Sequence, residues 1–137
     1  MHTMTKNIFF FILFGLLVFN TTAQQTPVVT SEGNSIYCPQ TEQSIVNSFN
    51  IENLESLDAL YIQISEGYSP GEDQLIYTGS NSNLDIVWNV SEGKLEISSL
   101  SGDELPIQEI INAVYDVVFF SGNPNPSDKV FSFTLGV

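Results

Sequence analysis

Carboxylates are the side chains of this sequence with the clearest chemical potential, since 16 of its 137 residues are Asp or Glu. Three of them, Glu72, Asp73 and Asp116, stand beside expected loops or strand ends, where carboxylate oxygens could ligate calcium. The Glu72-Asp73 pair lacks the D-x-D-x-D spacing of a dedicated calcium loop. The alternative is that Asp73 caps a turn through its own backbone while Glu72 is solvated. We therefore expect no cofactor, and keep calcium at these three residues as a weaker hypothesis.

Groups for acid–base or nucleophilic catalysis are scarce. Asp103 and Glu104 are neighbouring acids of the kind that glycosidases use in pairs, but a chain this acidic contains such neighbours by chance. Cys38 is the single cysteine, so it has no partner for an intrachain disulfide. The single histidine, His2, lies in the N-terminal leader, so Cys38 also has no imidazole to activate it. We expect no catalytic residues and no enzymatic activity.

Three tyrosines offer a different chemistry, the recognition of sugars. Tyr61, Tyr68 and Tyr77 could stack their rings on a glycan. The alternative is that these rings are half-buried packing residues, which is the commoner role of tyrosine in a β-sandwich.

The first 23 residues read as a secretory signal peptide. Lys6 supplies the positive start, residues 8–19 form an apolar run, and small residues ending at Ala23 precede the expected cleavage site. That run is shorter than the roughly 20 residues that span a bilayer, so we expect no stable membrane insertion after cleavage. An uncleaved anchor is the alternative. The sequence predicts a protein that is at least periplasmic, and secreted or at the cell surface.

The remainder of the chain is strongly acidic. Residues 24–137 keep every acidic residue but only Lys94 and Lys129, which gives a formal charge of two minus sixteen, or −14, with no arginine. A surface of this charge repels phosphate backbones, so nucleic acid is excluded as a partner.

Hydrophobic alternation with a period of two runs through most of this region and predicts β-strands. Residues 24–35 are polar and contain Pro and Gly, so they are expected to be a linker or a loose first strand. Residues 36–137 are expected to form one module. The expected strands are 44–51, 59–65, 74–78, 84–90, 94–98, 116–120 and 130–137.

One segment has helical spacing instead. Ile107, Ile110, Ile111 and Val114 fall on one face of a helix over 106–115, and Pro106 suits its first turn. Short strands at intervals of about ten residues, joined by Gly, Pro and Asn turns, are typical of a β-sandwich. We therefore predict an all-β fold, a β-sandwich with one short helix that crosses one end.

Three segments together resemble a known kind of module: residues 61–75 (YIQISEGYSPGEDQL), 87–97 (VWNVSEGKLEI) and 107–133, which ends in NPNPSDKVFSF. Their order resembles cadherin-like modules of chondroitin-sulfate-proteoglycan repeats. It is more closely similar to the N-terminal module of large surface proteins from Flavobacteria, in which a Tyr-Cys-Pro, here Tyr37-Cys38-Pro39, follows the signal peptide. The resemblance spans roughly residues 36–136.

This resemblance implies a cadherin/Ig-like sandwich that acts as a non-catalytic adhesion or spacer module of a larger surface protein. Its implied partners are neighbouring domains, cell-surface proteins or glycans. In that group a C-type lectin-like domain and a sorting domain for type IX secretion typically follow. Neither occurs in this sequence, so surface export and carbohydrate binding are unsupported for this polypeptide. The alternative function is a glycan- or calcium-binding module that acts at the loop ends of the sandwich.

Overall fold

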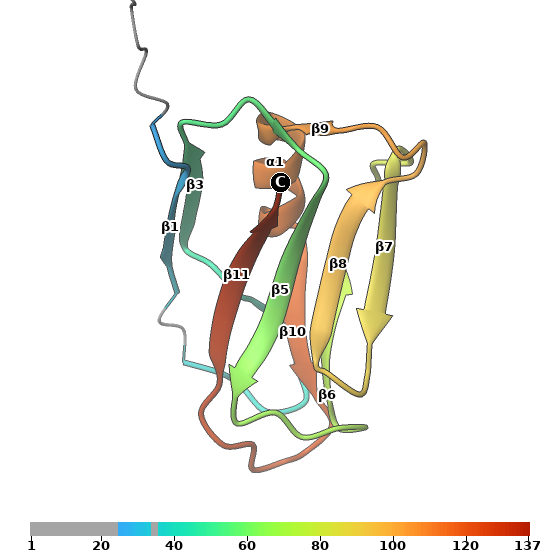
Figure 1. Cartoon of the computed structure of the whole chain (residues 1–137). Coiled ribbons are helices and arrows are strands. Elements are labelled where there is room, and N and C mark those ends of the chain that lie inside the picture. Colours follow the sequence, from blue (N-terminus) through green and yellow to red (C-terminus); the bar gives the residue numbers. More distant parts are fainter. Residues whose placement is uncertain (1–24, 34–35) are drawn as a thin grey trace, which may run out of the picture.

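Antiparallel sheets pack around one hydrophobic core (Figure 1). The computed structural model describes residues 25–33 and 36–137, so the predicted signal peptide, residues 1–23, lies outside the described residues. The larger sheet has the order β11-β5-β8-β7, formed by Val130–Gly136, Ala59–Glu66, Lys94–Ser99 and Leu84–Asn89. The smaller sheet has the order β2-β10-β6, formed by Gln43–Ser44, Val117–Ser121 and Asp73–Tyr77.

Two short ladders complete the described strands. The ladder β1-β3 joins Val28–Glu32 to Ser48–Glu52, and the ladder β4-β9 joins Ser56–Leu57 to Leu105–Pro106. The all-β prediction is therefore confirmed. Within the segment 24–35, expected to be a linker or a loose first strand, residues 28–32 pair with β3 along the full length of both strands.

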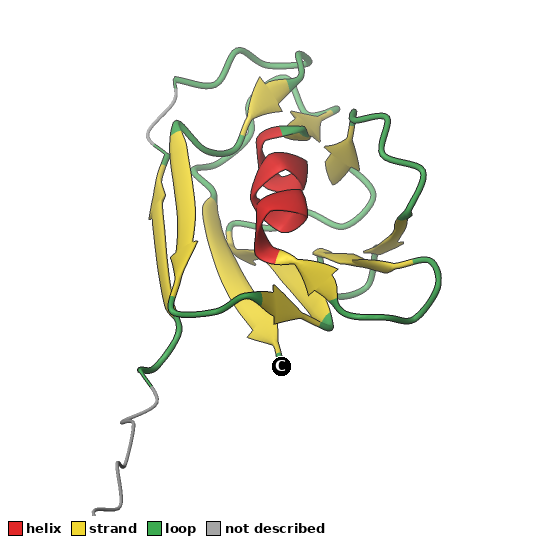
Figure 2. Cartoon of the chain, turned by 90° about the horizontal axis from the view of Figure 1, so that it is seen from above, coloured by secondary structure: helices red, strands yellow, loops and turns green. Residues whose placement is uncertain are grey.

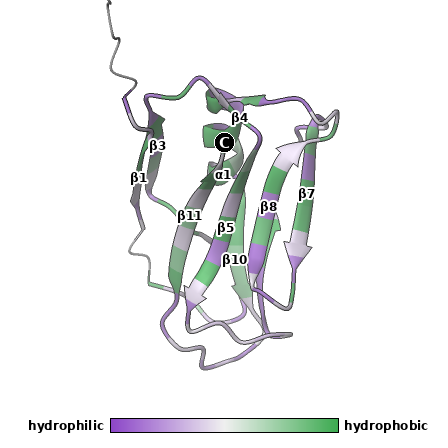
Figure 3. Cartoon of the chain, in the orientation of Figure 1, coloured by the Kyte–Doolittle hydropathy of each residue, from purple (hydrophilic) through white to green (hydrophobic). Residues whose placement is uncertain are grey.

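The alternation predicted for the large sheet is confirmed. Leu60, Ile62 and Ile64 of β5 are buried, and the residues between them are only half-buried. Leu95 and Ile97 of β8 face the core in the same way. Figure 3 shows this alternation of hydropathy along the strands. Burial of such side chains stabilises the fold by about 1.5–3 kcal/mol each, which is the reason that the strand register is fixed.

The segment 44–51 was predicted as one strand, and the structure divides it into β2 and β3. Ile45 and Val46 are consecutive and both buried, which a regular strand with alternating faces does not permit. The backbone N–H of Asn47 donates to the carbonyl of Glu32 at 2.6 Å. The chain therefore crosses from the β10 sheet to the β1-β3 ladder at this point.

The predicted helix is present as α1, Ile107–Tyr115, with Pro106 at its N-cap. Ile107, Ile110, Ala113 and Val114 are buried. Figure 2 shows the helix in the middle of the molecule, surrounded by strands. The helix contacts β3, β9 and β10, so its apolar face forms part of the core as well as connecting two strands.

Both ends of the described chain lie at the same end of the molecule. Asn53 Nδ2 donates to the carbonyl of Thr26 at 3.2 Å, and the backbone N–H of Asp58 donates to the carbonyl of Gly136 at 2.9 Å. The segment 53–58 thus touches both ends. In Figure 1, strand β1 begins at this end of the molecule and strand β11 ends there.

Candidate functional site at the loop end

The end of the molecule opposite the two chain ends is formed by the loops 67–72 and 122–129, which a buried ion pair joins. Lys129 Nζ lies 2.6 Å from Asp73 Oδ2, and their side chains are 7% and 0% exposed. Asp73 Oδ2 also accepts a hydrogen bond of 2.7 Å from the backbone N–H of Ser69. Lys129 Nζ donates further to the carbonyl of Gly67 at 2.5 Å and to Ser127 Oγ at 3.5 Å.

The structure does not bring the three calcium candidates together. Asp73 pairs with Ser121 at one end of the β6-β10 ladder, while Asp116 directly precedes Val117, which pairs with Tyr77 at the other end. Five paired residues separate the two carboxylates by roughly 15 Å. Glu72 is exposed and accepts a hydrogen bond of 3.0 Å from Asn123 Nδ2. Among the described residues, no group of three His, Cys, Asp or Glu side chains is arranged to hold a metal ion.

Beside the ion pair lies an open groove of about 920 Å³. Its walls come from the segment 36–46 and from the loop 124–131. Tyr37, Phe119 and Phe131 form a continuous aromatic row along it, with ring centroids 5.2 Å and 5.6 Å apart and ring planes inclined by 62° and 61°. Such edge-to-face contacts hold each ring in place. Three prolines also line the groove: Pro39, Pro124 and Pro126.

Polar groups of the groove are mainly amides and hydroxyls. Gln43, Asn125 and Ser127 line it together with Asp128. The one cation among the lining residues is Lys129, whose ammonium group is already bonded to Asp73. The groove can therefore donate and accept hydrogen bonds, and it has little capacity to neutralise an anionic ligand.

The three candidate tyrosines do not gather at one site. Tyr61 lies on β5 with Lys94 Nζ 5.6 Å from its ring centroid. Tyr68 packs edge-on against Trp88 at 6.1 Å, and its hydroxyl donates to the carbonyl of Val90. The hydroxyl of Tyr77 accepts a 3.3 Å hydrogen bond from the backbone of Asn81. All three rings are half-buried, as their packing alternative requires.

Tyr68 also lies close enough to the ion pair to be affected by it. Burial of the ring raises the pKa of the Tyr68 phenol above its usual value, and the negative charge of Asp73 adds to this increase. The phenol is therefore neutral at physiological pH and acts as a hydrogen-bond donor.

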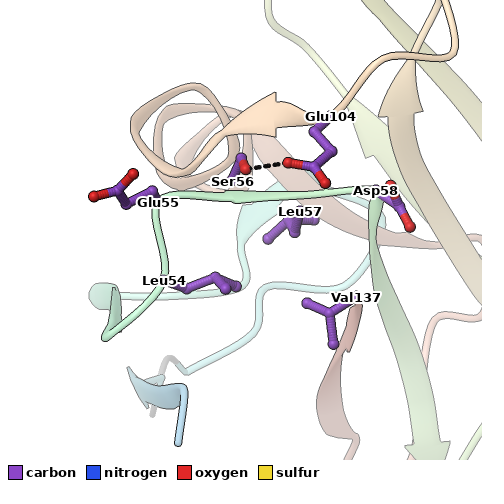
Figure 4. Close-up of a pocket in the computed structure, with 7 residues that line it drawn as sticks. All are labelled: Leu54, Glu55, Ser56, Leu57, Asp58, Glu104 and Val137. Atoms are coloured by element: carbon purple, nitrogen blue, oxygen red, sulfur yellow. Dashed lines mark hydrogen bonds between the residues drawn. The ribbon is translucent and has the colours of Figure 1, made fainter. Parts of the chain in front are cut away.

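The acidic pair Asp103-Glu104 lies at the end of the molecule where the chain ends meet. Glu104 accepts a hydrogen bond from Ser56, and Asp103 accepts one of 2.8 Å from Ser101. Glu104 lines a pocket of about 300 Å³ together with Glu55 and Asp58. In Figure 4 the carboxylate of Glu55 points away from those of Asp58 and Glu104.

Cys38 is exposed and not disulfide-bonded. Its carbonyl accepts hydrogen bonds from the N–H and the hydroxyl of Thr41, at 3.3 and 2.6 Å. These bonds close a tight turn, and they place Cys38 between Tyr37 and Pro39, which both line the groove.

Sequence reasoning identified Asp73 but not its partner, and it missed the groove. In the sequence, Lys129 stands out only as one of few positive charges, and Phe119 and Phe131 fall within expected strands. The signal that could have drawn attention to the groove was the proline pair of the loop 124–126 next to an aromatic strand.

No helix in the described part of the chain is long and apolar enough to cross a membrane. Comparisons with models of protein families, with curated proteins and with solved structures found no match to this chain.

Proposed function

We propose that this chain is a non-catalytic adhesion module of an exported protein, and that it binds a neutral glycan in the groove at its loop end. The single observation that carries this proposal is the position of the aromatic groove, which lies at the opposite end of the molecule from both chain ends. The export of the protein rests on the N-terminal sequence pattern. A cadherin-like kinship remains part of the proposal and rests on the sequence resemblance.

The positions of the chain ends favour adhesion over a spacer in line with other modules. A spacer enters at one end and leaves at the other, whereas here Thr26 and Gly136 both contact the segment 53–58. A module attached in this way projects from its neighbours. Its loop end then points away from the attachment, where a ligand can reach the groove.

The lining of the groove favours a sugar chain as the ligand. Tyr37 and Phe131 are half-buried, so each presents part of its ring to the groove. Amide side chains of Gln43 and Asn125 stand along the same groove and could bond sugar hydroxyls. Aromatic rings flanked by a few polar groups are typical of small-ligand sites. A neutral glycan suits this groove because Lys129 is neutralised by Asp73.

A glycan array followed by titration calorimetry on the best ligand tests the proposal. The double variant Gln43→Ala/Asn125→Ala removes two groove amides without touching the core. Loss of two hydrogen bonds at about 1 kcal/mol each weakens binding roughly 10- to 30-fold. The matched control is Asn112→Ala, which removes an exposed amide of α1 at the other end of the molecule and leaves affinity unchanged.

Two outcomes would overturn the proposal. One is an array on which the folded protein binds no neutral glycan. The other is a bound glycan whose affinity is the same for the groove double variant and for Asn112→Ala, since the ligand would then lie elsewhere.

A further inference from the structure

We infer that the Lys129 ammonium group is a built-in cation, which holds the loop end together in the way that a bound metal ion would. This inference does not depend on the proposed function. An ammonium group has three donor hydrogens, and Nζ has three oxygen partners: Gly67 O, Asp73 Oδ2 and Ser127 Oγ.

Two of these oxygens, a carboxylate and a backbone carbonyl, are of the kinds that calcium prefers. The three oxygens come from two loops that are far apart in the sequence, since Gly67 and Lys129 are separated by 62 positions. Backbone and side-chain hydrogen bonds from Gly122 and Asn123 to Glu72 also join these loops, and the Lys129 ammonium adds a buried positive charge to which both loops contribute an oxygen. This is the structural role that a metal ion plays in a loop-end site.

One oxygen of the Asp73 carboxylate does not take part in these bonds. Asp73 Oδ1 is buried, and no described residue gives it a hydrogen bond. A buried carboxylate oxygen without a donor is costly, and a lysine cannot reach both oxygens when its other hydrogens point elsewhere. A free cation that entered in place of the lysine head group would be able to contact both oxygens.

Burial makes the positive charge indispensable. The Asp73 side chain is fully buried, and removal of one partner of a buried pair leaves the other charge uncompensated. The Lys129 head group also lies 6.0 Å from the ring centroid of Phe119, beneath the aromatic row of the groove.

The first test uses the unaltered protein. Its melting temperature should be the same in calcium chloride and in a chelator, because Lys129 already occupies the cation position. Nuclear magnetic resonance should show a slowly exchanging ammonium signal for Lys129 and none for Lys94, whose ammonium group is more exposed. A clear stabilisation by calcium, or equally fast exchange at both lysines, would overturn the inference.

The second test replaces the built-in cation with a free one. Lys129→Ala removes three carbons and the ammonium group, which together correspond to propylammonium. Addition of about 0.2 M propylammonium chloride should raise the melting temperature of this variant by about 5 °C. Tetramethylammonium chloride at equal concentration is the control for ionic strength and should give no such rescue.

Lys129→Met is the matched variant, because its side chain fills the space but carries no charge. It should be destabilised like Lys129→Ala and should not respond to propylammonium. Equal responses of the two variants, or no difference between the two salts for Lys129→Ala, would contradict the inference. If neither variant folds, the measurements on the unaltered protein still decide it.

Discussion

The phenol of Tyr37 satisfies both backbone groups of Ser121: its oxygen accepts from the Ser121 N–H at 3.0 Å and donates to the Ser121 carbonyl at 3.2 Å. Strand β2 pairs with β10 only at Val118 and Phe119. The Tyr37 side chain therefore bonds the backbone of β10 beyond the point where its pairing with β2 ends. Ser121 is fully buried, so water cannot replace these bonds.

Tyr37→Phe should for this reason lower the free energy of unfolding by about 1–3 kcal/mol, the cost of leaving buried polar groups without partners. Urea denaturation measures the change. Tyr61→Phe is the control, since it removes a hydroxyl from a half-buried tyrosine on the large sheet and should change stability by less than about 0.5 kcal/mol. Equal losses in the two variants would show that the bridge to Ser121 contributes nothing specific.

Gly67 and Gly71 lie in the same loop and both have positive φ, at 73° and 84°. A Cβ on Gly67 would lie 2.1 Å from the carbonyl oxygen of Asp128, whereas a Cβ on Gly71 would meet nothing within 4 Å. Gly71→Ala should therefore cost only the roughly 1–2 kcal/mol of a left-handed residue.

Gly67→Ala should cost clearly more than Gly71→Ala, because the backbone of the other loop must also move away. Thermal or urea unfolding of the two variants under one set of conditions gives the comparison. A Gly67→Ala protein that is as stable as Gly71→Ala would mean that the loops 67–72 and 122–129 are not in close contact.

Tyr68 should make the protein sensitive to alkaline pH. Its pKa is raised in the folded state, first by burial and second by the charge of Asp73. The folded protein then holds this proton more tightly than the unfolded chain does, so the associated stability is present below about pH 10 and is lost as pH rises through the raised pKa.

Ultraviolet titration should show a tyrosine that ionises above the usual pH range of a phenol, and this late step should disappear in Tyr68→Phe. Asp73→Asn should move the step to lower pH without removing it, since burial is the larger cause. A titration curve that is identical for the original protein and Tyr68→Phe would refute this assignment.

Cys38 should react with an aromatic disulfide reagent in the native protein, because its side chain is exposed. One equivalent of thiol should be released without denaturant. Cys38→Ser should change stability by less than about 0.5 kcal/mol. A thiol that reacts only after unfolding would place Cys38 in the interior and contradict the structure.

Local patterns were enough to predict much of this fold. The alternation Leu60, Ile62, Ile64 identified β5 and its buried face, and Gly93, which has φ of 64°, marked the turn between β7 and β8. The helix was predicted because Ile107, Ile110, Ile111 and Val114 repeat at its period. In the structure all of them except the partly buried Ile111 are buried. These signals depend on neighbours within a few residues, which a sequence displays directly.

The parts that could not be predicted depend on contacts between distant residues. Strand β1 is exposed apart from Val29, and it is ordered by pairing with β3 about twenty positions away. Asp73 and Lys129 are separated by 56 positions, so nothing near either residue indicates the ion pair. The groove is assembled from the segment 36–46 and the loop 124–131 in the same way.

The arrangement of both chain ends at one end of the molecule has a mechanical consequence. If the isolated module were pulled by Thr26 and Gly136, the load would act first on the outermost pairs, Val28 with Glu52 and Gly136 with Ala59. Each hydrogen bond would then break in turn, as in the opening of a zipper, instead of all bonds of a strand resisting together in shear. Pulled by these two ends, the module would therefore open at a lower force than it would if the same strands were loaded in shear.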